Sequence, residues 1–234
     1  MGFIQSYIKF LASKIEDDIE KHVAEFLPRG KNLTYLDCGC DNGSKTISRA
    51  KIISTNEILG FENISERANL AREKGIKVYN SDLNERWPLG DSSVDCITAT
   101  EVVEHLVNLD NFFSESQRVL KKGGKIIIST ENLAAYHNIM ALILGNQPYT
   151  GPYLSKVYPI GHRPSAKFYQ HTLPMDPHIN VMTFKSLIQL LRNYRFKIIY
   201  KKGIGFYPLF SPISDFFSGI DYLHASYAMV MAQK

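Results

Sequence analysis

The sequence has few cysteines and no long apolar run, and each absence argues against a class of protein. Three cysteines (Cys38, Cys40 and Cys96) cannot pair completely, which argues against a disulfide framework. Residues 1–9 lack the continuous apolar stretch of a secretory leader, and the longest candidate elsewhere, 138–144, is far shorter than the ~20 residues that cross a bilayer. We therefore expect a cytoplasmic protein with free thiols.

Basic residues are too scattered to indicate a nucleic-acid binder. The chain of 234 residues carries 27 Lys and Arg against 23 Asp and Glu, a net charge of +4. The Lys and Arg residues form no stripe or arm of the kind that follows a phosphate backbone, so nucleic acid is not an expected partner. The length fits a single domain that can bury a substantial core.

Short apolar segments and amphipathic segments alternate between residues 33 and 130. This order predicts a parallel sheet with helices on both faces. The strands are expected at 33–37, 57–62, 76–80, 94–100 and 125–130, and the helices at 44–53, 65–74 and 109–122. A further helix is expected at 131–144, another at 183–193 with Thr183 as its cap, and strands at 195–201 and 224–232.

We divide this single domain into four parts. Residues 1–30 hold an amphipathic helix with apolar residues at steps of three and four, which we expect to cover the core or the mouth of the site. Residues 31–130 form the cofactor-binding core, and 131–182 an insertion that binds the acceptor. Its irregular part, 145–180, is rich in proline, tyrosine and histidine and is expected to act as a lid. Residues 183–234 supply the last helix and strands.

The stretch LDCGCDNGS, residues 36–44, lies where a parallel sheet binds ligands, between the first strand and the first helix of the alternation. Its Cys-x-Cys spacing has no second pair, so a metal-binding role for the cysteines fails. Its two glycines, Gly39 and Gly43, do not complete the Gly-x-Gly-x-x-Gly of dinucleotide sites, and Asp37 and Asp41 disfavour a phosphate. Such an acidic loop suits a ligand with an ammonium or sulfonium group.

Two more acids follow the next strands along the chain. Glu62 ends the second strand, where a carboxylate can accept hydrogen bonds from both hydroxyls of a ribose. Asp82 follows the third strand, where it can accept from an adenine amino group while Leu83 contacts the ring. Acids at three successive strand ends favour a nucleoside-containing ligand.

With these motifs the chain resembles the class I S-adenosylmethionine-dependent methyltransferases, near the methyltransferase type 11 and quinone-biosynthesis O-methyltransferases. The resemblance covers 33–131 through LDCGCDNGS, LGFE, NSDL, VDCITATEVVEHL and VLKKGGKIIIST. It implies a Rossmann-like, doubly wound α/β fold of seven strands, mostly parallel with one antiparallel strand near the C-terminus. It also implies S-adenosylmethionine as cofactor and S-adenosylhomocysteine as product.

The resemblance assigns the cofactor contacts residue by residue. The loop contacts the methionine part, the acid after strand two the ribose, and the acid after strand three the adenine. The cofactor set is then Asp37, Gly39, Cys40, Gly43, Glu62, Asn63, Asp82, Leu83 and Thr100. Asp41 stands where the family often has glycine, but aspartate tolerates the left-handed backbone better than most residues.

The string EVVEHL supplies candidates for the chemistry. If Glu101 opens a helix, then Glu101, Glu104 and His105 share one face, either bracing the helix or facing the methyl group. The string resembles quinone-biosynthesis O-methyltransferases and also the Glu-x-x-Glu-His motif of RNA 3′-terminal methyltransferases, in which a later histidine, here His178, completes a magnesium site. We take His105 and His178 as catalytic candidates and expect no metal, since one carboxylate pair and one nearby histidine are few ligands for magnesium.

The leading hypothesis is therefore O-methylation of a small-molecule, glycan or lipid-like acceptor. One alternative is a metal-assisted RNA terminal 2′-O-methyltransferase. Another, of a different class, is a non-catalytic cofactor-binding or partner protein on the same fold. The amphipathic N-terminal helix leaves peripheral membrane contact open, although acids on its polar face argue against it, and the sequence does not set the oligomeric state.

Overall fold

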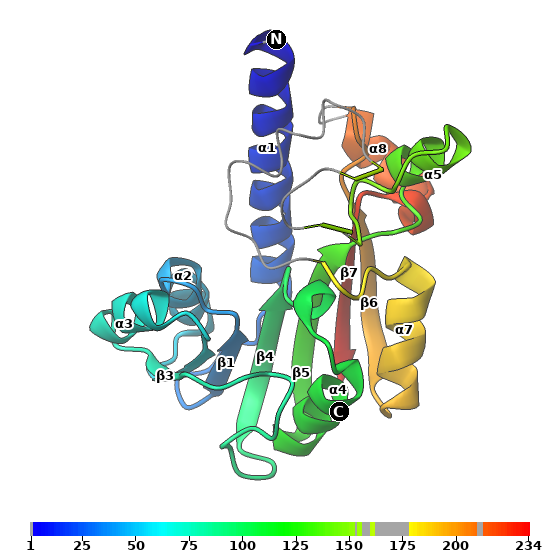
Figure 1. The fold of residues 1–234 in the computed structure, drawn as a ribbon. Helices are drawn as coiled ribbons and strands as arrows, with labels where there is room; N and C mark the ends of the chain where they lie inside the picture. Colours follow the sequence, from blue (N-terminus) through cyan, green and yellow to red (C-terminus); the bar gives the residue numbers. More distant parts are fainter. Residues whose placement is uncertain (1, 153, 156–159, 162–177, 210–212) are drawn as a thin grey trace.

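A seven-stranded sheet is the centre of the molecule (Figure 1). The computed structural model describes residues 2–152, 154–155, 160–161, 178–209 and 213–234. The strand order is β3-β2-β1-β4-β5-β7-β6, and every neighbouring pair is parallel except those that contain β7. This confirms the expected fold. The strands are β1 Thr34–Cys38, β2 Glu57–Phe61, β3 Lys77–Tyr79, β4 Val94–Thr100, β5 Leu120–Glu131, β6 Lys197–Ile204 and β7 Tyr227–Gln233.

The strand order reverses between β1 and β4, and this is where an open parallel sheet binds its ligand. The register brings the strand ends level, because Cys38 pairs with both Phe61 on β2 and Ala99 on β4. The residues that follow these three positions therefore emerge together at one edge of the sheet. They are Gly39, Glu62 and Thr100, all of which were predicted to belong to the site.

Helices cover both faces of the sheet. One face packs against α1 and α2 through residues such as Ile15, Ile19 and Ile53, and the other packs against α4 and α7 through Phe112 and Phe184. The helices are α1 Gly2–Phe26, α2 Ser44–Ile53, α3 Ser65–Glu73, α4 Leu109–Val119, α5 Tyr136–Ile143, α7 Phe184–Asn193 and α8 Ile213–Ile220, with 3₁₀ turns at Val103–His105 and Tyr222–His224.

The apolar stripe of α1 is a core surface from Leu11 onward. Leu11, Ile15, Ile19 and Val23 are all buried, so the helix covers the core as expected. Within the described residues, no helix combines the length and apolar character needed to cross a membrane.

Several predicted boundaries were wrong for local reasons. Residue 120 does not continue the predicted helix, because Leu120 pairs with Val94 and begins β5 before the Gly123-Gly124 step. Helix α5 begins only at Tyr136, after a turn held by the Asn132 side chain. The last strand begins at Tyr227, and α8 was not predicted.

Two further predictions concern the regions beside the site. Thr183 caps α7 as predicted, its hydroxyl accepting from the Ser186 amide at 3.2 Å. Most of the lid predicted at 145–180, including His162 and His171, lies outside the described residues.

Candidate functional site

A cavity of about 840 Å³ lies at the carboxyl ends of β1, β2, β4 and β5, with α1 forming part of its wall. Eight of the predicted site residues line it: Gly39, Glu62, Asn63, Asp82, Leu83, Thr100, His105 and His178. The other three, Asp37, Cys40 and Gly43, do not line it. They support the loop from behind.

Both glycines of the loop between β1 and α2 are required by the backbone and by the space around them. Gly39 has φ +72°, and a Cβ there would lie 2.7 Å from Val102 Cγ2. Gly43 has φ +79°, and its Cβ would lie 2.6 Å from Ile76 Cδ1. Asp41 also lies in the left-handed region, with φ 47°, as its residue type allows. The predicted turn is therefore present.

Asp37 does not point into the cavity, which corrects its predicted contact with the methionine part of the cofactor. It is 3% exposed and accepts hydrogen bonds from the Thr46 hydroxyl at 2.6 Å, the Thr98 hydroxyl at 2.6 Å and the Arg49 guanidinium at 3.0 Å. These donors occupy both of its oxygens. Asp37 thus fixes the start of the loop through the buried base of α2.

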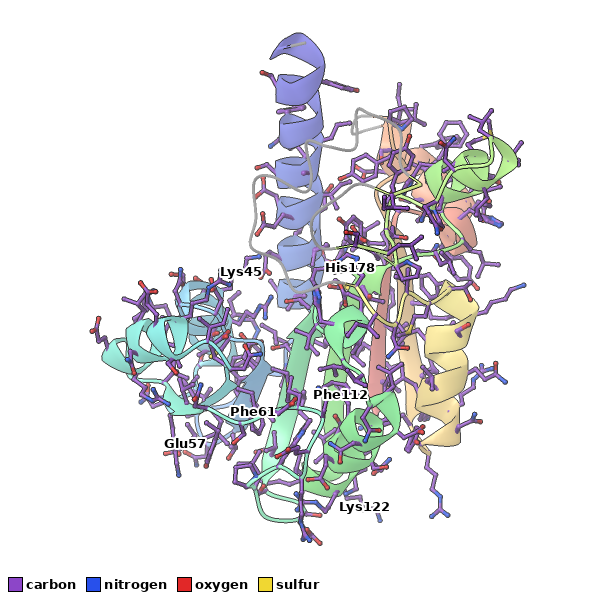
Figure 2. All side chains as sticks on the ribbon, viewed as in Figure 1. Lys45, Glu57, Phe61, Phe112, Lys122 and His178 are labelled. Atoms are coloured by element: carbon purple, nitrogen blue, oxygen red, sulfur yellow. The ribbon has the colours of Figure 1, made fainter. Side chains whose placement is uncertain are left out.

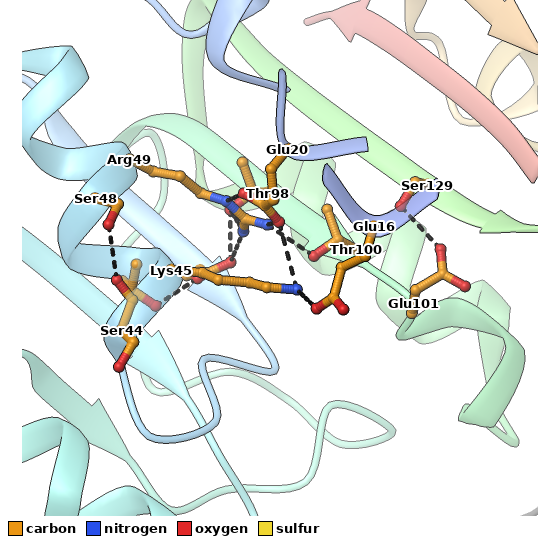
Figure 3. A network of polar contacts seen from close by, with 12 residues as sticks. Glu16, Glu20, Ser44, Lys45, Ser48, Arg49, Thr98, Thr100, Glu101 and Ser129 are labelled. Atoms are coloured by element: carbon orange, nitrogen blue, oxygen red, sulfur yellow. Dashed lines mark hydrogen bonds and ion pairs between the residues drawn. The ribbon is translucent and has the colours of Figure 1, made fainter. Parts of the chain in front are cut away.

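Arg49 continues this network to α1, as Figure 3 shows. Its guanidinium binds the Glu20 carboxylate on α1 and the Thr100 hydroxyl on β4. Lys45 pairs with Glu16 and Glu20 one turn away. Because Glu16 and Glu20 line the cavity, these ion pairs hold α1 against it.

Glu62 and Asp82 line the cavity and also support its walls. Glu62 Oε2 accepts from the Asp41 amide at 3.0 Å, and Oε1 accepts from the Ile64 amide at 2.9 Å. Asp82 Oδ1 accepts from the amide and the side chain of Asn84. A carboxylate offers about four acceptor positions, so each side chain keeps capacity for a ligand.

Five titratable side chains gather at the ends of β4 and β5, and we call them the acid–histidine cluster: Glu101, Glu104, His105, Glu131 and His178. All five line the cavity. Figure 2 shows the position of His178, just beyond the ends of β4 and β5. Glu101 does not open a helix, which corrects the prediction. It has φ 54° and is followed by the 3₁₀ turn that carries Glu104 and His105.

Neighbouring strands hold the acids of the cluster in place. Glu101 Oε1 accepts from the Ser129 hydroxyl at 2.9 Å, and Glu104 Oε2 accepts from the Thr130 hydroxyl at 2.9 Å. The Glu104 carbonyl accepts from the amides of the two residues that follow His178, at 2.7 and 3.0 Å. This last pair joins His178, distant in sequence, to the turn after β4.

The orientation of His178 is set by its Nδ1 atom. Nδ1 lies 2.7 Å from the Thr150 carbonyl oxygen, which can only accept, so Nδ1 is the donor. The same atom lies 3.2 Å from Glu131 Oε2, and the His178 and His105 rings are 4.8 Å apart in an edge contact. In the neutral imidazole the lone pair is then on Nε2.

Burial and mutual repulsion shift the pKa values of the cluster. Burial, with the charges of Glu104 and Glu131, raises the pKa of Glu101 well above its ordinary value, and burial raises the pKa of Glu104 to about 7. Burial alone would lower the pKa of His178, but the hydrogen bond and charge of Glu131 outweigh it and raise that pKa. The cluster therefore holds groups that exchange protons near neutral pH.

The cluster also fits a divalent cation. One ligand atom each from Glu104, His105 and His178 lie within 4.8 Å of one another, and the buried Glu104 Oε1 has no hydrogen-bond partner by distance and angle among the described residues. Mixed carboxylate and imidazole ligands suit several divalent metals. These are the ligands that the RNA 3′-terminal resemblance implied, with His178 as the later histidine.

Three contributors to the site were missed in the sequence. Glu131 ends β5, so the rule that identified Glu62 and Asp82 would have found it. Arg49 and Glu20 had no such signal. They lie within ordinary amphipathic helices, and their pairing depends on how α1 crosses the sheet.

Comparisons with known proteins agree with the fold. A family model described as "Methyltransferase domain" matches residues 7–201. Sterol 4-C-methyltransferase of Caenorhabditis elegans is 32% identical over 132 residues, covering 51% of this chain and 38% of that protein. Mitochondrial ubiquinone biosynthesis O-methyltransferase of Rattus norvegicus is 27% identical over 145 residues, covering 57% of this chain and 41% of that protein. The matched regions thus span about two fifths of these relatives.

A solved structure gives the same fold. The crystal structure described as a putative S-adenosylmethionine-dependent methyltransferase from Listeria monocytogenes superposes with a TM-score of 0.66 at 17% identity, covering 94% of this chain and 99% of that one. At this identity the likeness shows the Rossmann-like fold alone.

Proposed function

Because the chain belongs to the methyltransferase domain family, we propose that it transfers the methyl group of S-adenosylmethionine to a hydroxyl oxygen of a small-molecule, glycan or lipid-like acceptor. One observation carries the proposal: the acid–histidine cluster lines the same cavity as the loop between β1 and α2. A cofactor held by the loop would face groups able to accept a proton.

At the cofactor end, Glu62 would accept from the ribose hydroxyls and Asp82 from the adenine amino group. Leu83, with Phe61 and Ile64 beside it on the cavity wall, would contact the adenine ring. Gly39 gives the backbone close approach to the methionine part, and Asn63 and Thr100 flank it. Asp37, Cys40 and Gly43 would act indirectly, by fixing the loop.

At the acceptor end, the reaction is an in-line displacement at the sulfonium methyl. The acceptor oxygen forms a bond to the methyl carbon as the sulfur–carbon bond breaks, and its proton moves to a base. We assign that role to His178 Nε2, with His105 beside it, because Nδ1 is held by Thr150 and Glu131. The carboxylates of the cluster can then pass the proton to solvent.

The balance of the lining favours oxygen over carbon as acceptor atom, although one relative is named as a C-methyltransferase and another as an O-methyltransferase. Methylation of an unactivated carbon builds positive charge, which aromatic rings stabilise. Only two aromatic residues other than histidine, Phe61 and Tyr227, line the described part of the cavity, against five residues in the acid–histidine cluster. Such a surface suits proton removal.

A cation bound by Glu104, His105 and His178 would polarise the acceptor oxygen and lower its pKa. This is the feature that the RNA-terminal alternative requires. The cavity is otherwise poorly suited to RNA, because the two cations that line its described part are paired with acids: Lys45 with Glu16, and Arg67 with Asp41. Neither is left to neutralise a phosphate backbone.

The test measures transfer of a labelled methyl group from the cofactor to panels of phenolic small molecules, glycans, lipid-linked alcohols and RNA oligonucleotides. We expect incorporation in one of the first three panels, undiminished by chelator. Incorporation into RNA 3′ ends, lost in chelator and restored by magnesium, would replace this proposal with the RNA alternative. If titration calorimetry at millimolar S-adenosylmethionine shows no heat of binding, the proposal and the RNA alternative are both contradicted.

A further inference from the structure

One end of the molecule exposes many large apolar side chains, and we call this surface the apolar pole. Figure 1 shows α5 and α8 side by side there, with the N-terminal end of α1 projecting in the same direction. The most exposed members include Ile143 at 70%, Ile220 at 67% and Phe216 at 64%. The described members are Met140, Leu142, Ile143 and Leu144 at α5, and Ile213, Phe216, Phe217 and Ile220 on α8.

The two helices form one surface because aromatic rings join them. The Tyr136 ring at the start of α5 lies 5.4 Å from Phe206, and Phe206 lies 5.8 Å from Phe217 on α8. The Tyr136 hydroxyl also donates to Asp221, just after α8, at 2.8 Å. The apolar residues are therefore held together.

Charge is nearly absent from this surface. Residues 136–152 contain no Asp, Glu, Lys or Arg, although such residues make up 21% of the chain, and α8 contains a single one, Asp215. Burial of ionised groups in hydrocarbon is strongly unfavourable. A surface without them can enter a lipid interface at little electrostatic cost.

The directions of the side chains distinguish a fluid partner from a protein partner. Leu142, Ile143 and Leu144 are consecutive and all exposed, as are Phe216 and Phe217. Successive residues on a helix point about 100° apart, so Leu142 points away from the side shared by Met140, Ile143 and Leu144, whereas the exposed residues of α8 form one stripe. A rigid partner or a second copy would cover one stripe, whereas lipid chains can surround all of them.

We propose that the apolar pole inserts into the surface of a lipid bilayer. Lys201, whose ammonium lies 5.3 Å from the ring centre of Tyr222 beside α8, supplies a cation at the margin, where anionic headgroups would lie. The inference rests on the proposed function, because contact with a bilayer favours the lipid-like acceptors among the three classes proposed above. The cavity reaches Ala12 on α1, the helix whose N-terminal end projects in the same direction as the pole.

The test is co-sedimentation with vesicles of phosphatidylcholine and phosphatidylglycerol in a ratio of about three to one. We expect the wild type to sediment with the vesicles and the double variant Ile143→Glu/Phe216→Glu to lose at least tenfold in partition coefficient. Leu70→Glu, an equally polar change at a 43% exposed position on α3, should bind like the wild type.

Two results would overturn the proposal. One is a wild type that stays in the supernatant. The other is a dimer, detected by light scattering, that the double variant dissociates, which would make the pole a contact between copies. Cofactor titration in vesicle-free buffer separates this inference from the proposed function, because all three proteins should bind the cofactor alike.

Discussion

The loop between β1 and α2 and the acid–histidine cluster lie on the same cavity, yet their polar groups are arranged in opposite ways. Around the loop each acid is matched: Asp37 by three donors, and Glu62 by two backbone amides. In the cluster, Glu101 and Glu104 lie together with raised pKa values, and within the part of the chain that the structure describes Glu104 Oε1 has no hydrogen-bond partner.

The difference separates holding a ligand from changing one. A loop that positions a cofactor gains from rigidity, which matched ion pairs and hydrogen bonds provide. Groups that move protons need pKa values near the working pH, which burial and like charges produce at a cost in stability. Each of the following predictions tests one side of this contrast.

The largest effect is expected at His178. If it is the base, His178→Ala should lower turnover about 10²–10⁴-fold and leave cofactor affinity nearly intact. Single-turnover rates and melting temperature, measured on the same preparation, separate chemistry from folding. His224→Ala, which removes a histidine paired with Asp221 away from the cavity, is the control. Unchanged turnover per folded molecule would remove His178 from the chemistry.

The next effect concerns the buried pair behind the loop. Arg49→Met leaves the buried Asp37 without its cation and removes the nearer of the two cations of Glu20, so the free energy of unfolding should fall by about 3–5 kcal/mol. Lys45→Met breaks pairs of a half-exposed lysine and should cost no more than about 1 kcal/mol. Urea denaturation of both variants gives the comparison, and equal losses would contradict it.

The cluster should make stability depend on pH. The pKa of Glu104 is raised from 4.5 to about 7, so the folded chain binds this proton more tightly than the unfolded chain does. Stability should therefore fall as pH rises from about 4.5 to 7, by about 3 kcal/mol at most. Residue 104 does not titrate in Glu104→Gln, so the slope should become shallower by the contribution of Glu104, while the raised pKa values of Glu101 and His178 still act in the same direction.

The measurement is urea denaturation at several pH values in chelator, so that no cation occupies the cluster. Glu66→Gln on the exposed first turn of α3 should keep the wild-type slope. A Glu104→Gln curve parallel to the wild type would mean that this carboxyl is not held protonated.

The smallest effect is expected at Glu62. Glu62→Ala would remove hydrogen bonds to the ribose hydroxyls, each worth about 1.5–3 kcal/mol, so cofactor affinity should fall at least tenfold by calorimetry. The same change frees the Asp41 amide, so Asp41→Ala serves as the control: it removes the Arg67 ion pair but keeps that amide bond. Equal affinities for Glu62→Ala and wild type would contradict the ribose assignment.

The sequence predicted the cofactor side of the sheet better than the acceptor side. Strand ends can be recognised where an apolar run stops at an acid, and this located Glu62 and Asp82. It could not show that Asp37 turns inward, because its partner Arg49 is a helix residue like many others. Nor could it place Glu131 beside His178, since that contact joins residues 47 positions apart across the edge of the sheet.

The close contact of β2 with the loop has a consequence for the evolution of this chain. A Cβ at Gly60 would lie 2.6 Å from Cys40 Sγ, so the two positions share one small volume. A larger residue at 60 therefore requires a smaller residue at 40, and glycine there would remove both Sγ and Cβ from this volume. Among descendants, positions 40 and 60 should therefore change together, although neither side chain reaches the cavity.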